Sequence, residues 1–346
     1  MVYPPFYYVL VSPFAALSYL AAMRFWMLML GGVTCSYFWL ILNHFPTIGR
    51  RPFHVFIILV ASLFFTPLLT SLTMAQKSVV LLLILTSTFL LLRNRKPLAA
   101  GVVFGLIAFK PHLGLPIGIA MLLKGQWRFV AGSAITVGSL VGICLATGPD
   151  LCVDYFNQCL SQGDYTGNAG YMLSEAQSLH AVCHLAFDAV SPKLALAIAG
   201  CLTLAVCLVL RLILKGPLET DSQLFGLQFA SLVFATVLIS PHFYQYDLTI
   251  LLLPMMIIWS VLSGNWNHGT NFVVGETHRH LMLGLTLLLF FGASKFTAIA
   301  SATNVQPSNV ILLTLLVTVW QARQNPAKLL SFGENRPIRA KEIAAS

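Results

Sequence analysis

Charged residues are scarce in this sequence. Asp, Glu, Lys and Arg make up 9% of the 346 residues, whereas hydrophobic residues make up 58%. Soluble proteins carry about 25% charged residues, so this composition excludes an ordinary soluble domain. The many aromatic residues exclude a disordered chain. Long apolar runs recur, each close to the roughly 20 residues that cross a bilayer core. We therefore predict an integral, multi-pass membrane protein.

The sequence also lacks the motifs of nucleotide chemistry. It contains no P-loop, no GxGxxG fingerprint, no GxSxG elbow and no protein-kinase signature. The formal net charge is +9, yet no basic patch with interleaved aromatic residues indicates a nucleic-acid partner. The seven cysteines form no CxxC pair, and no strict internal repeat supports an inverted-repeat transporter. An enzyme of soluble nucleotides is therefore not indicated.

The apolar runs predict an all-α, polytopic transmembrane helix bundle with about 10 spans and additional re-entrant segments. Residues 3–20 contain three prolines, so we expect a re-entrant or interfacial segment there. Residues 1–346 are predicted to form one membrane domain. The expected spans are 25–45, 53–74, 78–92, 99–109, 129–147, 194–214, 224–239, 248–262, 281–300 and 310–320, with a half-span at 113–123.

The positions of Lys and Arg predict the orientation of the chain. Cytoplasmic loops collect these residues. Here 15 of the 20 lie on one side, provided that residues 3–20 do not cross and that the chain turns at Lys110 and Pro111. We expect a basic cytoplasmic tail at 323–346, an external polar loop at 148–192, and residence in the plasma (inner) membrane.

Polar side chains gather at the external ends of the expected spans. Such residues are costly in lipid and usually mark function or a wet cavity. The turns that carry them face one side, so we expect them to converge on one external site. The candidate substrate-binding residues are Gln76, Lys110, His112, Gln177, His242, Tyr246 and Asp247.

Two of these residues have alternative interpretations. A buried Lys110 needs an anion or a carboxylate partner, so we interpret it as a contact for a lipid-linked phosphate, with His112 as a second donor. The alternative is a lysine that snorkels to the outer interface. Asp247 is placed to cap the next helix, and capping alone explains it. Together with His242 and Tyr246 it also offers the hydroxyl-binding and acid–base groups of a sugar site.

Several short motifs, in this order, resemble glycosyltransferase family 87, whose members are multispanning enzymes of the GT-C type. The resemblance extends from Tyr3 to about Leu253. The motifs are Tyr3-Pro-Pro-Phe, Ser12-Pro-Phe, Ala75-Gln76, Phe109-Lys110-Pro111, Gln126-Trp127-Arg128, Ala176-Gln177-Ser178-Leu179 and Ser240-Pro241-His242 with Tyr246-Asp247-Leu248.

The resemblance implies transfer of a hexose, typically mannose, from a polyprenyl-phosphate carrier to a glycan or glycolipid acceptor on the outer face. It implies that Lys110 faces the donor phosphate, that Gln177 belongs to the sugar site, and that His242 and Asp247 line the cavity roof. Family activity depends on an acidic residue in a loop ahead of the Tyr-Pro-Pro motif. This chain begins at Met1-Val2-Tyr3, so that loop and the preceding span are expected to be missing from it, either because the start codon is misassigned or because the chain is a truncated relative.

The expected truncation leaves the catalytic base open, with Asp247 and Glu175 as the candidates in this chain. No protein metal ligand is predicted and no cofactor is assigned, and use of a divalent metal ion remains an open alternative. Two other functions remain as alternatives: a transporter or lipid-carrier flippase, suggested by the break at Lys110 and Pro111, and a catalytically inactive, truncated relative.

Overall fold

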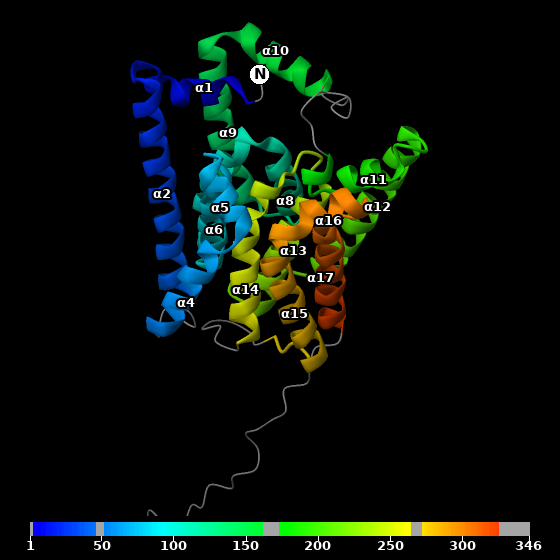
Figure 1. Ribbon diagram of the computed structural model, residues 1–346. Coiled ribbons are helices and arrows are strands. Elements are labelled where there is room, and N and C mark those ends of the chain that lie inside the picture. The colour runs from blue at the N-terminus through cyan, green and yellow to red at the C-terminus, as the bar shows by residue number, and fades with distance from the viewer. Residues whose placement is uncertain (1–2, 46–51, 162–172, 264–271, 325–346) are drawn as a thin grey trace, which may run out of the picture.

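The computed structural model describes residues 3–45, 52–161, 173–263 and 272–324, and its regular elements are all helical (Figure 1). The all-α prediction is thus confirmed for these residues. The α-helices are α1 (Pro5–Val11), α2 (Tyr19–His44), α4 (Pro52–Leu63), α5 (Thr66–Thr73), α6 (Ser78–Arg93), α7 (Pro97–Gly105), α8 (Pro111–Leu123), α9 (Trp127–Thr147), α10 (Pro149–Ser161), α11 (Leu179–Phe187), α12 (Pro192–Ile213), α13 (Gln223–Ile239), α14 (Leu252–Leu262), α15 (Glu276–Gly292), α16 (Phe296–Thr303) and α17 (Pro307–Gln324). The 3₁₀ helices are η1 (Ser12–Ala16), η2 (Leu106–Phe109), η4 (Leu173–Glu175), η5 (Gln245–Leu251) and η6 (Ala293–Lys295).

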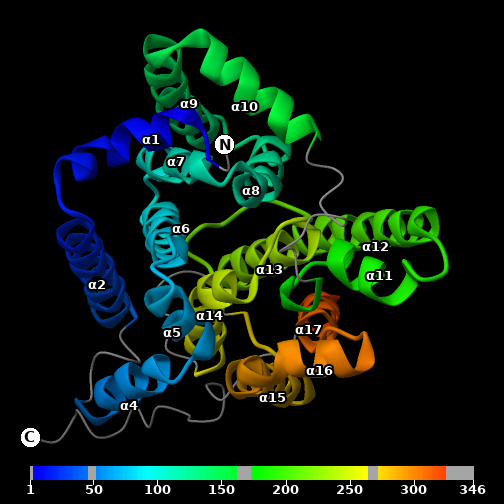
Figure 2. The same ribbon diagram turned by 45° about the horizontal axis from the view of Figure 1, so that its top comes forward.

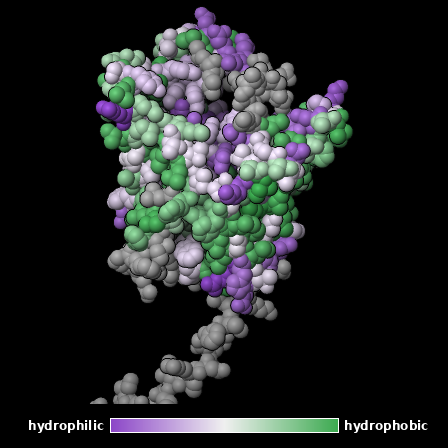
Figure 3. Space-filling model, viewed as in Figure 1, coloured by the Kyte–Doolittle hydropathy of each residue, from purple (hydrophilic) through white to green (hydrophobic). Residues whose placement is uncertain are grey.

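Five helical segments among the described residues are long and apolar enough to cross a membrane. Other apolar helices, such as α6 and α13, are shorter. Hydrophobic side chains cover much of the flank of the molecule, and hydrophilic ones gather toward its upper and lower ends (Figure 3). These features identify an integral, multi-pass membrane protein. The five segments are Tyr19–His44, Trp127–Thr147, Pro192–Ile213, Gln245–Leu262 and Glu276–Thr303.

One expected span is broken in the structure. The run at 53–74 divides into α4 and α5, because Pro67 lies in the first turn of α5 and cannot donate a helical hydrogen bond. The run at 281–300 lies within the candidate span Glu276–Thr303, in which the short η6 joins α15 to α16. Residues 3–20 hold only α1, η1 and the start of α2, which confirms that they form no long regular helix.

The polar segment at 148–192 is partly helical rather than an irregular loop. It contains α10, η4 and α11. Figure 2 shows α10 above α8 and α9, and α11 beside α12. The basic tail predicted at 323–346 lies almost wholly outside the described residues.

Helix α13 is the centre of the bundle. Every residue from Phe225 to Leu238 is buried, and the helix packs against α8, α12, α14 and α17 (Figure 2). A helix that is apolar on all sides is suited to such a fully buried position. Its buried amide group at Gln228 donates from Nε2 to the Ile213 carbonyl oxygen at 3.1 Å. The central helix therefore leaves few polar groups unpaired inside the bundle.

Helices α7 and α9 cross closely because glycines line the crossing. A Cβ added at Gly101 would overlap the Phe129 carbonyl oxygen, and one added at Gly132 would overlap the Leu98 carbonyl oxygen. Thr136 Oγ1 donates to the Val102 carbonyl oxygen across the same crossing at 2.8 Å. Small residues at such crossings let membrane helices approach closely. This contact holds α7, and therefore η2 and Lys110 after it, against α9.

We expect Gly132→Ala to lower the free energy of unfolding by about 1–3 kcal/mol, because the new methyl group has no space in the crossing. Thermal unfolding of the purified protein in detergent measures this loss. Gly138→Ala is the matched control, since it lies on the same helix with nothing within 4 Å of its added Cβ. Equal stability of the two variants would contradict the close crossing.

Candidate functional site

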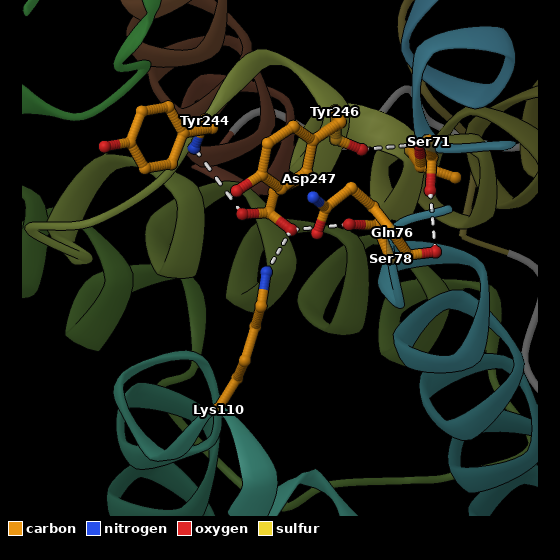
Figure 4. A network of polar contacts seen from close by, with 8 residues as sticks. Ser71, Gln76, Ser78, Lys110, Tyr244, Tyr246 and Asp247 are labelled. Carbon is orange, nitrogen blue, oxygen red and sulfur yellow. Dashed lines mark hydrogen bonds and ion pairs between the residues drawn. The ribbon is translucent and has the colours of Figure 1, made fainter. Parts of the chain in front are cut away.

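A buried ion pair lies at the centre of the candidate site. Lys110 Nζ lies 2.6 Å from Asp247 Oδ1, and the Ser78 hydroxyl donates to the same oxygen at 2.6 Å (Figure 4). The other carboxylate oxygen accepts from the Tyr244 backbone N–H at 3.5 Å. Lys110 is 7% exposed and Asp247 1%. The carboxylate partner required for a buried Lys110 is thus Asp247, 137 residues away in sequence.

Helix breaks place both charges. Helix α7 tightens into η2, and Lys110 follows with non-helical backbone angles before Pro111 begins α8. Pro111 suits the first position of a helix, where no backbone donor is needed. Asp247 lies in the first turn of η5, where its carboxylate reaches back to the Tyr244 N–H. The predicted capping position of Asp247 is therefore observed, together with the ion pair.

Tyr246 and Gln76 extend the site on either side of the ion pair. Lys110 Nζ lies 5.3 Å from the centre of the Tyr246 ring, within cation–π range. The Tyr244 and Tyr246 rings stack, with centroids 5.6 Å apart. The Gln76 side chain points toward the Lys110–Asp247 pair in Figure 4. These side chains offer hydroxyl and amide groups next to a paired charge.

A second lysine lies close by, held by aromatic rings from the N-terminal segment. Lys77 Nζ donates to the Tyr7 hydroxyl at 3.0 Å and lies 3.6 Å from the centre of the Tyr3 ring. Burial and the charge of Lys110 lower the pKa of Lys77 to about 8. Burial and the charge of Asp247 raise the pKa of Tyr3 to about 12, so its phenol stays protonated. Lys77 is therefore a half-buried lysine whose pKa lies close to neutral pH.

Residues 174–178 pack against the turn that carries His242 and Tyr244. Ala176 and Tyr244 form an antiparallel bridge, and the Gln177 N–H donates to the Phe243 carbonyl oxygen at 2.6 Å. The Gln177 side chain is fully buried: its Oε1 accepts from Ser308 at 2.6 Å, and its Nε2 donates to the Glu175 carbonyl oxygen at 3.1 Å. Gln177 thus fixes this segment in place through both its backbone and its amide group.

The two candidate bases differ in availability. Both oxygens of Asp247 accept hydrogen bonds or the Lys110 ammonium. Glu175 is half-buried, its charge acts on Tyr246, and its carboxylate makes no hydrogen bond or ion pair with any residue that the structure describes. A base must be available to take the proton of the acceptor. Among the described residues the Glu175 carboxylate is unengaged, whereas the Asp247 carboxylate already holds Lys110 and Ser78.

The two predicted histidines approach each other at the end of α13. The His112 and His242 rings lie 6.3 Å apart and perpendicular, and burial lowers the pKa of His242, which keeps its ring neutral near pH 7. His112 Nε2 is buried and has no hydrogen-bond partner among the described residues. No three His, Cys, Asp or Glu side chains in the described ranges gather as a possible metal-ligand group.

Comparison with known proteins identifies the chain. Residues 1–241 match the sequence profile of glycosyltransferase family 87. The chain belongs to this family. No curated protein and no solved structure matches it. The resemblance read from the short motifs is thus confirmed, and the family 87 chain is a membrane glycosyltransferase with a sugar donor and an acceptor.

The structure of the family 87 chain brings most of the predicted residues together but divides them by environment. The ion pair is formed by Lys110 and Asp247, and Tyr246 and Gln76 lie beside it. His112 and His242 approach each other separately. Sequence reasoning did not include Lys77, Ser78 and Tyr3 among the binding residues. Lys77 follows Gln76 directly, and Tyr3 belongs to a family motif, so the sequence could have indicated both as binding residues. No sequence pattern indicated Ser78.

Proposed function

We propose that this family 87 enzyme transfers a hexose, most simply mannose, from a polyprenyl-phosphate carrier to a glycan or glycolipid acceptor at the outer face of the membrane. The observation that carries the proposal is the buried Lys110–Asp247 pair beside Lys77, in an otherwise apolar bundle. Asp247 pairs with Lys110, which leaves the Lys77 ammonium without an ion-pair partner among the described residues. A lipid-linked phosphodiester supplies the matching negative charge.

The geometry supports separate roles for the two lysines. Among the described residues the Lys77 ammonium contacts the Tyr3 ring and the Tyr7 hydroxyl and forms no ion pair, so it is the one available to the donor phosphate. Lys110 is held by Asp247 and lies beside the Tyr246 ring. Gln76 and Tyr246 supply hydroxyl-binding groups for the sugar. Charge on the leaving phosphate develops as the glycosidic bond breaks, so fixed cations there favour the transition state.

Glu175 is proposed as the general base. Its carboxylate takes the proton of the acceptor hydroxyl while that oxygen forms a bond to the anomeric carbon of the sugar. The bond from the anomeric carbon to the phosphate oxygen breaks, and its electrons leave with the polyprenyl phosphate. Asp247 keeps Lys110 in place.

Membranes that contain the overproduced protein test the proposal. Radiolabelled mannose should pass from polyprenyl-phosphate-mannose to a membrane glycolipid or glycan. Release of the polyprenyl phosphate should match the transferred label. Donor binding without transfer would instead favour a catalytically inactive relative, and absence of both with every polyprenyl-phosphate sugar would refute the proposal.

A transporter or flippase is the second candidate. The break between η2 and α8 at Lys110 resembles the discontinuous helices that form transport sites. Reconstituted vesicles distinguish the two functions, because a flippase moves the lipid-linked sugar across the bilayer without changing it covalently.

The topology that the proposal requires has about ten crossings and a cytoplasmic C-terminus. The Lys110–Asp247 site would then lie toward the outer face. Cysteine labelling of intact cells tests this orientation: Lys193→Cys should react with an impermeant reagent from outside, whereas Arg128→Cys should not. Both positions are exposed.

We expect donor affinity to fall about tenfold between pH 7 and pH 9. Lys77 is charged below its pKa of about 8 and loses its proton above it, whereas an ordinary lysine stays charged over this range. Isothermal titration with polyprenyl-phosphate-mannose measures the change. Lys77→Arg should bind with nearly constant affinity, since a guanidinium stays protonated. A wild-type affinity that stays constant from pH 7 to pH 9 would remove Lys77 from the donor site.

A further inference from the structure

A long groove runs along the side of the bundle, and one end of it begins at His112, two residues after Lys110. Helices α8 and α12 both pack on α13 and leave between them a groove of about 1020 Å³. One end of the groove is lined by His112 and Ser240, and the other by Lys124, Arg211 and Lys215. The residues between the two ends are almost all apolar.

The length of the groove suits an acyl chain of one leaflet. Its α8 wall extends from His112 to Lys124, which corresponds to about 18 Å at 1.5 Å per residue. Half of a hydrocarbon core of about 30 Å is about 15 Å. Leu115, Ile119 and Leu208 line the walls and are each more than half exposed. They therefore offer uncovered apolar surface to a lipid chain.

The cations at the basic end differ in availability. Lys124 Nζ donates to the carbonyl oxygens of Leu214 and Gly216 at the end of α12, and Arg323 donates to the carbonyl oxygens of Leu212, Ile213 and Lys215. These two side chains compensate the negative end of the helix dipole.

Arg211 lies in the last turn of α12, Lys215 follows just after the helix ends, and both are exposed and line the groove. Neither forms an ion pair with a residue that the structure describes. Since Lys124 and Arg323 already satisfy the helix end, Arg211 and Lys215 remain as two uncompensated cations at the mouth of an apolar groove. Basic pockets between membrane helices bind anionic lipid head groups.

We propose that this groove binds an anionic phospholipid, with its phosphate between Arg211 and Lys215 and an acyl chain along α8 and α12. The arginine offers the paired N–H groups that match a phosphate, and the lysine adds a point charge. The head-group end of this site lies at the opposite end of the groove from His112 and the ion pair.

Lipid retention by the purified full chain tests the proposal. The protein is incubated in detergent with equal amounts of phosphatidylglycerol and phosphatidylethanolamine, and bound lipid is counted by native mass spectrometry. Phosphatidylglycerol should bind in preference. The double variant Arg211→Gln/Lys215→Gln should bind it about ten- to thirtyfold more weakly, from the loss of two cations near the membrane surface. The control is Arg128→Gln/Lys193→Gln, which removes two exposed cations outside the groove. It therefore has the same net charge as the groove variant.

A second pair of variants tests the groove itself. Leu208→Trp fills the apolar wall and should displace the lipid with both cations intact, whereas Leu204→Trp, exposed on the same helix but outside the lining, should not. Equal phosphatidylglycerol binding by the groove and control variants would overturn the proposal. So would binding of a polyprenyl phosphate, rather than phosphatidylglycerol, that depends on Arg211 and Lys215, because the groove would then belong to the donor carrier.

Discussion

Replacement of Lys110 by Met is expected to lower the free energy of unfolding by about 3–5 kcal/mol, because the change leaves a buried carboxylate without its counter-ion. Asp247 is 1% exposed and would keep only the Ser78 hydroxyl and a long contact to the Tyr244 N–H. The stability of the detergent-solubilised protein, followed by thermal unfolding, measures the loss. The exposed Lys193→Met serves as the control for loss of a cation.

Substitutions at Asp247 test whether the lost stability comes from an unpaired buried charge. Asp247→Asn alone should also destabilise the protein, since it leaves the buried ammonium of Lys110 unpaired. Lys110→Met combined with Asp247→Asn should recover most of the lost stability, because no buried charge remains. If Lys110→Met unfolds at the same temperature as Lys193→Met, the ion pair contributes nothing and the central element of the site is wrong.

Replacement of Glu175 by Gln is expected to lower the turnover number about 10²- to 10⁴-fold, because an amide cannot accept the proton of the acceptor hydroxyl. The fold should survive, since the hydrogen bond of this residue within the described chain uses its backbone oxygen. Donor affinity should also survive, since Lys77 and Lys110 are unchanged. Single-turnover transfer of labelled mannose, together with a separate binding measurement, distinguishes the two effects.

A carboxylate from the same polar segment provides the control. Asp188 lies 2.7 Å from His184 Nδ1 through Oδ1, so its charge is already engaged. Asp188→Asn should keep most of the activity. Full turnover of Glu175→Gln would exclude Glu175 as the base, and a matched loss in both variants would indicate a structural effect of the segment rather than proton transfer.

Sequence patterns predicted the helices of this chain better than their contacts. The run at 129–147 became α9 almost unchanged because a long, predominantly apolar segment without proline is stable in lipid as a helix. The run at 53–74 was predicted as one span although Pro67 lies within it, and the structure divides it there. Hydropathy measures apolar content, whereas the loss of a single backbone donor decides where a helix ends.

The pairing of the polar residues could not be predicted from the sequence. Lys110 required a carboxylate, but both Glu175 and Asp247 lay on suitable turns, and only the packing of α6 against η5 brings Ser78 and Asp247 together. Gln177 was predicted in the sugar site, and its burial against Ser308 depends on α17, 131 residues later. Such contacts arise from tertiary packing and leave no local pattern.

The wide sequence separation of the ion pair also has a consequence for biosynthesis. Lys110 leaves the ribosome 137 residues before Asp247, and at about 5–20 residues per second this interval lasts roughly 7–27 s. During that time the lysine lacks the carboxylate with which it pairs in the folded protein, so α7 and α8 do not yet have their final contacts. Membrane integration of the first half of the chain therefore remains provisional until η5 has been made, and a stalled nascent chain that ends before Asp247 should be a substrate for quality-control proteolysis.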